Sequence, residues 1–193
     1  MGYITTTAFK QYRGIASTKD ATLIGDLLER AQAQVEAYCD RTIVAPTTAA
    51  TRYYDALRDT SDDLRTLYLD ADLASITTIT NGDGTTVAST HYVTEPRHSP
   101  PYRSIRLTTL ADDNWTYTAA PEDAIQVLGR WGYSTRAPVD VQQATIRLAA
   151  YMYAQKDVST FDVTMFQDAG MMTIPQGMPR DVKELLEPYR RLR

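Results

Sequence analysis

The 193-residue sequence contains a single cysteine, Cys39, so the chain can form neither an internal disulfide nor a cysteine-rich metal site. No stretch approaches the ~18 consecutive apolar residues of a membrane-spanning helix. The first residues lack the apolar run of a secretory signal, and neither a repeat period nor a low-complexity tract is present. These absences favour a globular chain in a reducing or redox-indifferent setting.

Positive charge is also in short supply. Twenty Lys and Arg residues face 24 Asp and Glu residues, which gives a formal net charge of −4 and a pI of about 5.2. This balance argues against a general binder of nucleic acid or of acidic membranes. It is compatible with a mildly acidic channel surface along which DNA moves without being bound. With 43% hydrophobic and 23% charged residues, the chain can bury a core as one domain or as a domain with a large insertion.

Signatures of catalysis are missing as well. The sequence has no G-x-S-x-G elbow, no P-loop and no H-E-x-x-H motif. His91 and His98 lack a third ligand at a suitable spacing. Adjacent acids occur at 62–63, 112–113 and 122–123, in polar, turn-like surroundings that favour solvated side chains over a carboxylate pair held across a cleft. We therefore predict that the chain is not an enzyme and has no catalytic residue, cofactor site or metal site.

What the sequence does contain is helical periodicity at both ends. Helices are predicted over residues 5–13, 19–39, 138–157 and 180–189. The clearest pattern is in residues 19–39, where apolar residues follow the i, i+3, i+4, i+7 spacing of one helix face. These residues are Ile24, Leu27, Leu28, Ala31, Val35, Tyr38 and Cys39.

The third of these helices is expected to be the central strut of the fold. Pro138 suits its first turn because the missing N–H would have no intrahelical acceptor there. Apolar residues cover most of the girth and leave only a strip around Arg147 for solvent, which predicts a helix buried among other elements. Leu148 lies at the centre of the apolar face, and Trp131 is expected to pack just before the helix. Trp131, Pro138 and Leu148 are the predicted structural anchors.

Between the helical ends, Thr, Tyr, Val and Ile concentrate between turn residues, which is typical of strands. The predicted fold class is α+β: a helical bundle core, residues 1–43 plus 125–193, with a β-rich insertion lobe over 44–124. Asn81-Gly-Asp-Gly84 predicts a tight turn, because Asn and Gly accept positive φ. Strands are predicted over residues 51–56, 66–70, 75–80, 85–89, 91–94, 104–108 and 124–129.

Several segments, taken in order and spacing, resemble the head–tail connector (adaptor) proteins of long-tailed double-stranded DNA bacteriophages, the gp6-like group. No single motif is diagnostic, and the β insertion is larger than in the minimal, nearly all-helical adaptors. The segments that carry the resemblance are Tyr3-Ile-Thr5 with Phe9, residues 35–43, residues 67–70 with 76–79, residues 125–133 leading into Pro138, and residues 179–191.

The resemblance implies a structural virion protein. Such proteins form a homo-oligomeric ring, commonly of twelve subunits, that docks beneath the portal protein. The ring offers its lower face to the next connector, a stopper or a tail-terminator protein, and double-stranded DNA passes through its lumen without sequence-specific binding. The implied location is the head–tail interface of the virion, and the host cytoplasm during assembly, with no membrane partner.

The last helix is the predicted portal-binding element. Its apolar stripe is typical of a helix that lies in a partner's groove, and its basic tail suits an acidic surface. Adaptors of this kind often bind the portal through their C-terminal segment. We expect residues 161–193, which show Gly and Pro at intervals, to be mobile in the free protein and ordered on the portal. The predicted contacts are Val182, Leu185, Leu186, Tyr189, Arg190, Arg191 and Arg193.

Two other functions stay open at this point. The main alternative is a β-rich carbohydrate- or ligand-binding module with helical flanks, because Trp115 and several of the 13 tyrosines lie in the β region and aromatic rings can form a sugar platform. The other is a hydrolase that uses Asp112, Asp113 or Glu122.

Overall fold

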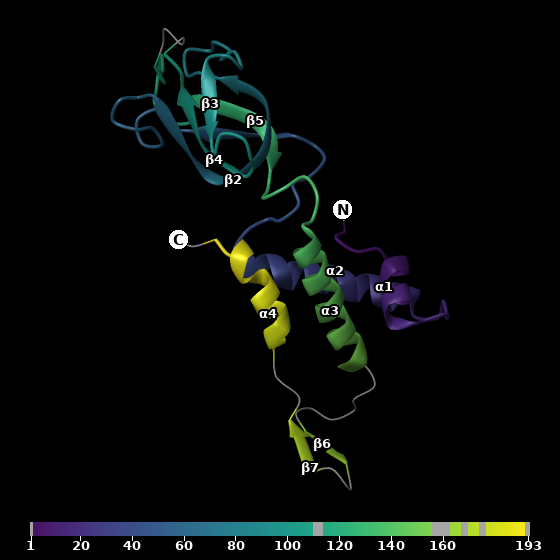
Figure 1. Cartoon of the computed structure of the whole chain (residues 1–193). Helices are drawn as coiled ribbons and strands as arrows, with labels where there is room; N and C mark the ends of the chain where they lie inside the picture. Colours follow the sequence, from purple (N-terminus) through teal and green to yellow (C-terminus); the bar gives the residue numbers. More distant parts are fainter. Residues whose placement is uncertain (1, 110–113, 156–162, 167–169, 174–176, 192–193) are drawn as a thin grey trace. The chain divides into compact units, whose positions relative to one another are not determined.

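The computed structural model of the chain describes residues 2–109, 114–155, 163–166, 170–173 and 177–191 (Figure 1). The protein is of mixed α/β class and divides into two compact units. Unit 1 comprises residues 1–40 and 137–193 and contains the helices α1 to α4. Unit 2 comprises residues 41–136 and contains a five-stranded sheet.

The helices of unit 1 lie within a few residues of their predicted positions. Within the unit, α2 packs against α3, α3 packs against α4, and α1 packs against α2. The helices are α1 (Thr6–Arg13), α2 (Ala21–Cys39), α3 (Val139–Gln155) and α4 (Arg180–Leu186), and α4 continues into a 3-10 turn (Glu187–Tyr189).

Local capping fixes the ends of the first two helices. The Thr5 hydroxyl accepts a hydrogen bond from the Ala8 N–H at 3.1 Å, which satisfies one of the free donors at the start of α1. Gly14 ends this helix in the left-handed conformation, with φ of 66°. Asp40 ends α2 in the same way, with φ of 51°, a conformation that Asp tolerates better than most residues.

The buried faces of α2 and α3 follow the predicted periodicity. On α2, the residues of the predicted stripe are buried, except that Tyr38 is partly exposed. On α3, Leu148 is 1% exposed, whereas the neighbouring Arg147 faces solvent. Phe9 of α1 packs edge-on against Tyr153 of α3, with 5.8 Å between ring centroids. Within unit 1, α3 packs against each of the other three helices.

A short pair of strands corrects the prediction for residues 161–179. The sequence there favours an irregular arm, but the structure contains two antiparallel strands, β6 (Val163–Phe166) and β7 (Gly170–Thr173). Four-residue strands are too short to show a period-2 pattern that stands out from the surrounding Gly, Met and Pro residues.

The sheet of unit 2 is antiparallel between all neighbouring strands, in the order β1-β5-β2-β4-β3. The long strand β2 serves two partners: its first half pairs with β4 and its second half with β5. Shifts in register near Leu73 and between Ile76 and Thr78 mark bulges, which let a long strand bend. The strands are β1 (Ala50–Tyr54), β2 (Thr66–Thr80), β3 (Tyr92–Glu95), β4 (Tyr102–Leu107) and β5 (Ile125–Trp131).

Both tryptophans belong to the core of unit 2, and each indole N–H is satisfied. Trp115 Nε1 donates to the Arg65 carbonyl at 3.2 Å, and Trp131 Nε1 donates to the Ala50 carbonyl at 2.8 Å. Gly129 permits the close approach of β5 to β2, because a Cβ at this position would lie 2.5 Å from the Ser75 carbonyl oxygen. The core consists of Tyr54, Ala56, Leu67, Leu69, Leu73, Ile79, Ile105, Leu107, Trp115, Ile125, Val127 and Trp131.

Three features of unit 2 differ from the prediction. Strand β5 belongs to this unit and not with the helices, because it pairs with both β1 and β2. The predicted strands 66–70 and 75–80 are one strand, since the Asp and Ala residues between them, although poor strand formers, continue its extended backbone through the register shift. The predicted strand 85–89 forms only an isolated bridge, between Thr80 and Thr86, across the predicted turn at Asn81.

Candidate interaction surface

The predicted portal-binding residues lie on α4 and the turn that follows it, in unit 1. Val182 and Leu186 are fully buried, because this side of α4 packs against the other helices of the unit. Leu185 and Tyr189 are partly exposed. The apolar stripe is therefore divided: half of it is core, and only the other half can meet a partner.

The burial of α4 corrects two parts of the prediction. Val182 and Leu186 cannot lie in a partner's groove while they are part of the core of unit 1. Residues 180–191 are likewise a folded part of this unit, not a mobile arm. Arg193 lies outside the described residues.

A polar cluster attaches the end of α4 to the end of α2. The Tyr38 hydroxyl donates to Glu187 Oε2 at 2.9 Å, and Arg190 Nη1 lies 3.1 Å from Glu187 Oε1. The Arg190 guanidinium also stands 5.3 Å from the centre of the Tyr38 ring. The Arg191 N–H donates to the Cys39 carbonyl at 2.9 Å, which satisfies one of the free acceptors at the C-terminus of α2.

Electrostatics within this cluster favour the charged form of Glu187. The hydrogen bond from Tyr38, followed by that from Arg190, lowers the pKa of the Glu187 carboxyl. Burial and the hydrogen bond to Glu187 together raise the pKa of the Tyr38 hydroxyl. Near neutral pH the cluster therefore contains a carboxylate, a neutral phenol and a guanidinium.

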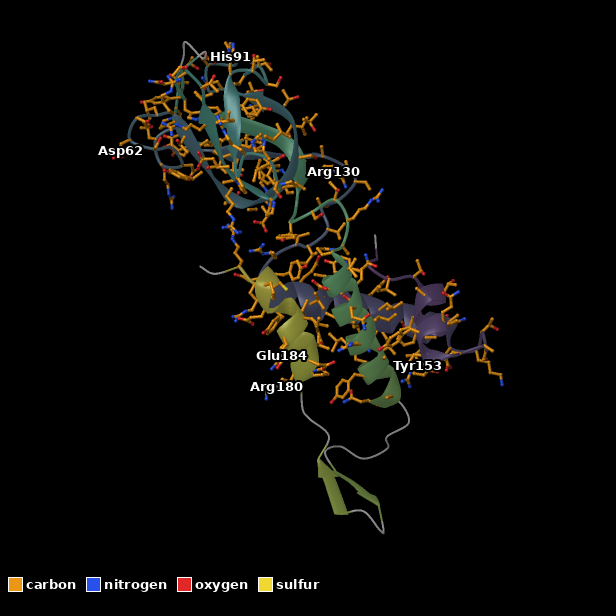
Figure 2. The ribbon with its side chains drawn as sticks, viewed as in Figure 1. Asp62, His91, Arg130, Tyr153, Arg180 and Glu184 are labelled. Atoms are coloured by element: carbon orange, nitrogen blue, oxygen red, sulfur yellow. The ribbon has the colours of Figure 1, made fainter. Side chains whose placement is uncertain are left out.

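The outward side of α4 carries charged residues. Arg180 and Glu184 form an ion pair at 3.0 Å and lie on the same side of the helix (Figure 2). Asp181 pairs with Arg147 of α3 at 2.9 Å. Exposed pairs of this kind contribute little to stability, about 1 kcal/mol or less, so a partner can rearrange them at low cost.

Unit 1 also has a groove of about 620 Å³ between α2 and the end of α3. Leu23 stands at this groove and is 36% exposed. It falls outside the apolar period of α2, which is why periodicity alone does not mark it. The groove is lined by Leu23, Leu27, Arg30, Ala33, Gln34, Met152 and Gln155.

The predicted anchors fall in different units. Leu148 is in the core of unit 1, and Pro138 directly precedes α3, where its carbonyl accepts the Gln142 N–H at 2.9 Å. Trp131 ends β5 in unit 2, is 7% exposed and carries the Arg52 guanidinium 4.6 Å above its ring.

Around Trp131, unit 2 contains a polar cluster that the sequence does not reveal. Asp70 pairs with Arg52 at 2.6 Å and accepts the Tyr54 hydroxyl at 2.8 Å. Burial, with the hydrogen bond to Asp70, raises the pKa of Tyr54 far above its usual range. These groups come from β1 and β2, which are not hydrogen-bonded to each other, so the contact cannot be predicted from the spacing of the residues in the sequence.

A buried ion pair in the same unit is equally hidden in the sequence. Arg41 Nε lies 3.5 Å from Asp72 Oδ2, with side chains only 5% and 4% exposed. The Arg41 guanidinium also stands 5.2 Å from the centre of the Tyr133 ring. Arg41 opens unit 2 and Asp72 lies in the middle of β2, so only the folded chain shows the contact.

The described residues that were considered for catalysis and sugar binding do not form a site. Among the described residues, no group of three or more His, Cys, Asp or Glu side chains could hold a metal ion. Glu122 is exposed in a loop, and Asp112 and Asp113 lie outside the described residues. Trp115 is fully buried and therefore cannot stack on a sugar. None of the described helices has both the length and the apolarity to cross a membrane.

The fold as a whole is shared with chains of a virus-like particle. The neck of an empty GTA particle, computed with C6 symmetry, gives a TM-score of 0.57 at 18% identity and covers 99% of this chain and 91% of that chain. The virion of a native gene transfer agent (GTA) particle gives 0.57 at 19% identity, with the same coverage. The neck of a native GTA particle, computed with C12 symmetry, gives 0.53 at 20% identity and covers 97% and 91%. The two-unit fold is thus one that occurs in phage-like particles.

The sequence itself matches the family model "Head completion protein" over residues 3–192. The chain belongs to the head completion protein family. Membership in this family makes it a structural component of a phage-like virion, located at the head–tail interface. Two of the structures that share its fold are of the neck of such a particle, and structural virion components of this kind are generally not enzymes. No curated protein matches the sequence.

Proposed function

We propose that the chain is a ring-forming head–tail connector (adaptor) of the gp6-like kind. In this proposal it docks on the portal protein, extends the DNA channel and provides the platform for the next connector, stopper or tail terminator. The observation that carries the proposal is the family match over residues 3–192. The shared fold, which extends over 99% of this chain, supports it.

The proposed assembly is a closed ring of twelve subunits. The related neck structures were computed with C6 and C12 symmetry. A ring of twelve subunits is compatible with either symmetry. In a closed ring one heterologous interface is repeated around the axis. We assign the helical core of the ring to unit 1, whose helices α2, α3 and α4 pack together, and regard unit 2 as an inserted lobe.

The proposed portal contact is the exposed side of the α4 end, supported from within by buried Val182 and Leu186. Leu185 and Tyr189 supply partly exposed apolar surface there, and Arg190 and Arg191 suit an acidic partner. Double-stranded DNA would pass through the lumen without sequence-specific contacts, as the net charge of −4 allows.

Electron microscopy of the purified chain, alone and with the portal protein, tests the proposal. A twelve-fold ring or a cap on the portal is the expected result. A monomer that leaves the portal bare at high concentration would contradict it.

Two variants locate the contact. Leu185→Asp should abolish capping and keep helical circular dichroism, because Leu185 is only partly buried. Leu57→Asp is the matched control, since Leu57 is an exposed leucine of unit 2, and should cap normally. If Leu185→Asp caps with unchanged affinity, the portal contact lies elsewhere.

A further inference from the structure

Unit 2 has a small pocket at the free edge of its sheet. Strand β3 is one of the two edge strands, and among the described residues it pairs with β4 alone. The pocket has a volume of about 250 Å³. Four of its five lining residues carry N–H or O–H donors, and the lining consists of Tyr92, Val93, Thr94, Arg97 and His98.

The lining of the pocket includes a cationic side chain, Arg97, and no acidic one. The neighbouring Glu95 carboxylate faces the Ser104 hydroxyl on β4, with 3.5 Å between Oε2 and Oγ. Arg97 and His98 are exposed, and within the described part of the chain the Arg97 guanidinium takes part in no ion pair. In a chain of net charge −4, the pocket thus has a cationic side chain and no acidic one in its lining.

The loop that carries Arg97 and His98 is restricted in conformation. Pro96, Pro100 and Pro101 fix φ at three of its positions. The Thr94 hydroxyl donates to the Arg97 carbonyl at 3.5 Å, which joins the loop to the end of β3. A restricted loop loses less conformational entropy when a ligand binds.

We propose that this pocket binds a phosphate group. The planar guanidinium of Arg97 can present two parallel N–H donors to phosphate oxygens. The His98 ring supplies a further N–H donor at the mouth. Burial, with a smaller contribution from Tyr102, raises the pKa of Tyr92, so its hydroxyl keeps its proton and can donate.

A phosphate group reaches such a pocket from two sources, the backbone of double-stranded DNA or a free phosphate ion. The assignment depends only on residues of unit 2 and not on ring formation or portal binding. If the pocket does not bind phosphate, the proposed portal capping is unaffected. If the chain does not cap the portal, the proposed phosphate binding is unaffected.

Nuclear magnetic resonance of the two histidine rings tests the proposal in the full chain. His98 lines the pocket and His91 does not, so the second ring is an internal reference, and His91→Gln assigns the signals. The protein, in a buffer without phosphate, is titrated with inorganic phosphate and separately with a short DNA duplex. The expected result is a saturable shift of the His98 signals with a much smaller shift of those from His91.

Arginine variants make the test specific. Arg97→Ala should weaken binding about tenfold or more, because it removes charge-assisted hydrogen bonds. Arg136→Ala removes an exposed arginine of the same unit that does not line the pocket, and should bind as the parent does. A response to the duplex alone assigns the site to the DNA backbone, and a response to inorganic phosphate supports a general phosphate site. If neither probe shifts His98, or if both arginine variants weaken binding equally, the proposal is overturned.

Discussion

Two adjacent residues of α3 experience opposite environments. Leu148 is 1% exposed in the core of unit 1, and the Arg147 side chain is 41% exposed and pairs with Asp181 at 2.9 Å. Leu148→Asp would bury an unpaired carboxylate, which costs several kcal/mol out of a typical stability of about 5–15 kcal/mol. Arg147→Asp loses a surface pair and places two carboxylates together, at a cost of about 1 kcal/mol. We therefore expect Leu148→Asp to unfold unit 1 and Arg147→Asp to be mild in urea denaturation. Equal unfolding midpoints would mean that the helix faces are assigned wrongly.

The buried pair of unit 2, Arg41 and Asp72, gives the second prediction at this scale. Removing one partner leaves the other buried without compensation, which typically costs about 3–5 kcal/mol. Arg41→Met and Asp72→Leu should each destabilise the protein strongly. The double variant should recover most of the loss, because it buries neither charge. Urea denaturation of all four proteins measures the coupling, and additive losses would show that the pair does not act as a unit.

At the scale of the element, α4 shows what helical periodicity leaves undecided: the pattern predicts the helix but not the surface against which its apolar face packs. The helix itself was predictable, since Val182, Leu185 and Leu186 have helical spacing. That spacing does not say whether the apolar face meets the same chain or another one. Only the packing of α4 against α3 and α2 shows that Val182 and Leu186 belong to the core.

The packing of α4 predicts that truncation of the chain lowers its stability. A free arm could be deleted without effect, but deletion of residues 180–193 removes Val182 and Leu186 and exposes the apolar surface that they cover. At about 1.5–3 kcal/mol for each buried side chain, the loss should be about 3 kcal/mol or more. We expect a clear drop in the melting temperature of the truncated chain. Lys183→Asp, an exposed substitution on the same helix, is the control and should melt close to the parent. If the truncated chain has the same melting temperature as the parent, α4 does not stabilise unit 1 and is a separate arm.

Local patterns were sufficient for the helices and insufficient for the sheet and the pockets. Thr5 and Gly14 delimit α1 through chemistry between residues close in sequence, so its ends were predictable. Strand β2 was predicted as two strands, because local composition does not show that β4 and β5 pair with successive halves of it. The Arg41–Asp72 pair joins residues 31 positions apart and has no local signal. The pocket at β3 likewise depends on where the Pro-rich loop folds back.

At the scale of the whole molecule, the division into units depends on one strand. The change from helical to strand-like composition suggests a lobe of residues 44–124, whereas the compact unit comprises residues 41–136. The difference includes β5, which lies between β1 and β2 in the sheet and contributes Ile125, Val127 and Trp131 to its core. It also includes Arg41, the partner of buried Asp72.

Two fragments test this division. Residues 41–136 contain a complete sheet and core, and we expect them to fold alone, with dispersed amide signals in nuclear magnetic resonance and a cooperative urea transition. Residues 44–124 lack the strand that joins β1 to β2, and we expect them to be unfolded or aggregated under the same conditions. In the reciprocal experiment, replacing residues 41–136 of the full chain by a Gly/Ser linker should leave helical circular dichroism, because the helices pack mainly among themselves. If the shorter fragment folds as cooperatively as the longer one, β5 is not needed for the integrity of unit 2, and its assignment to that unit is wrong.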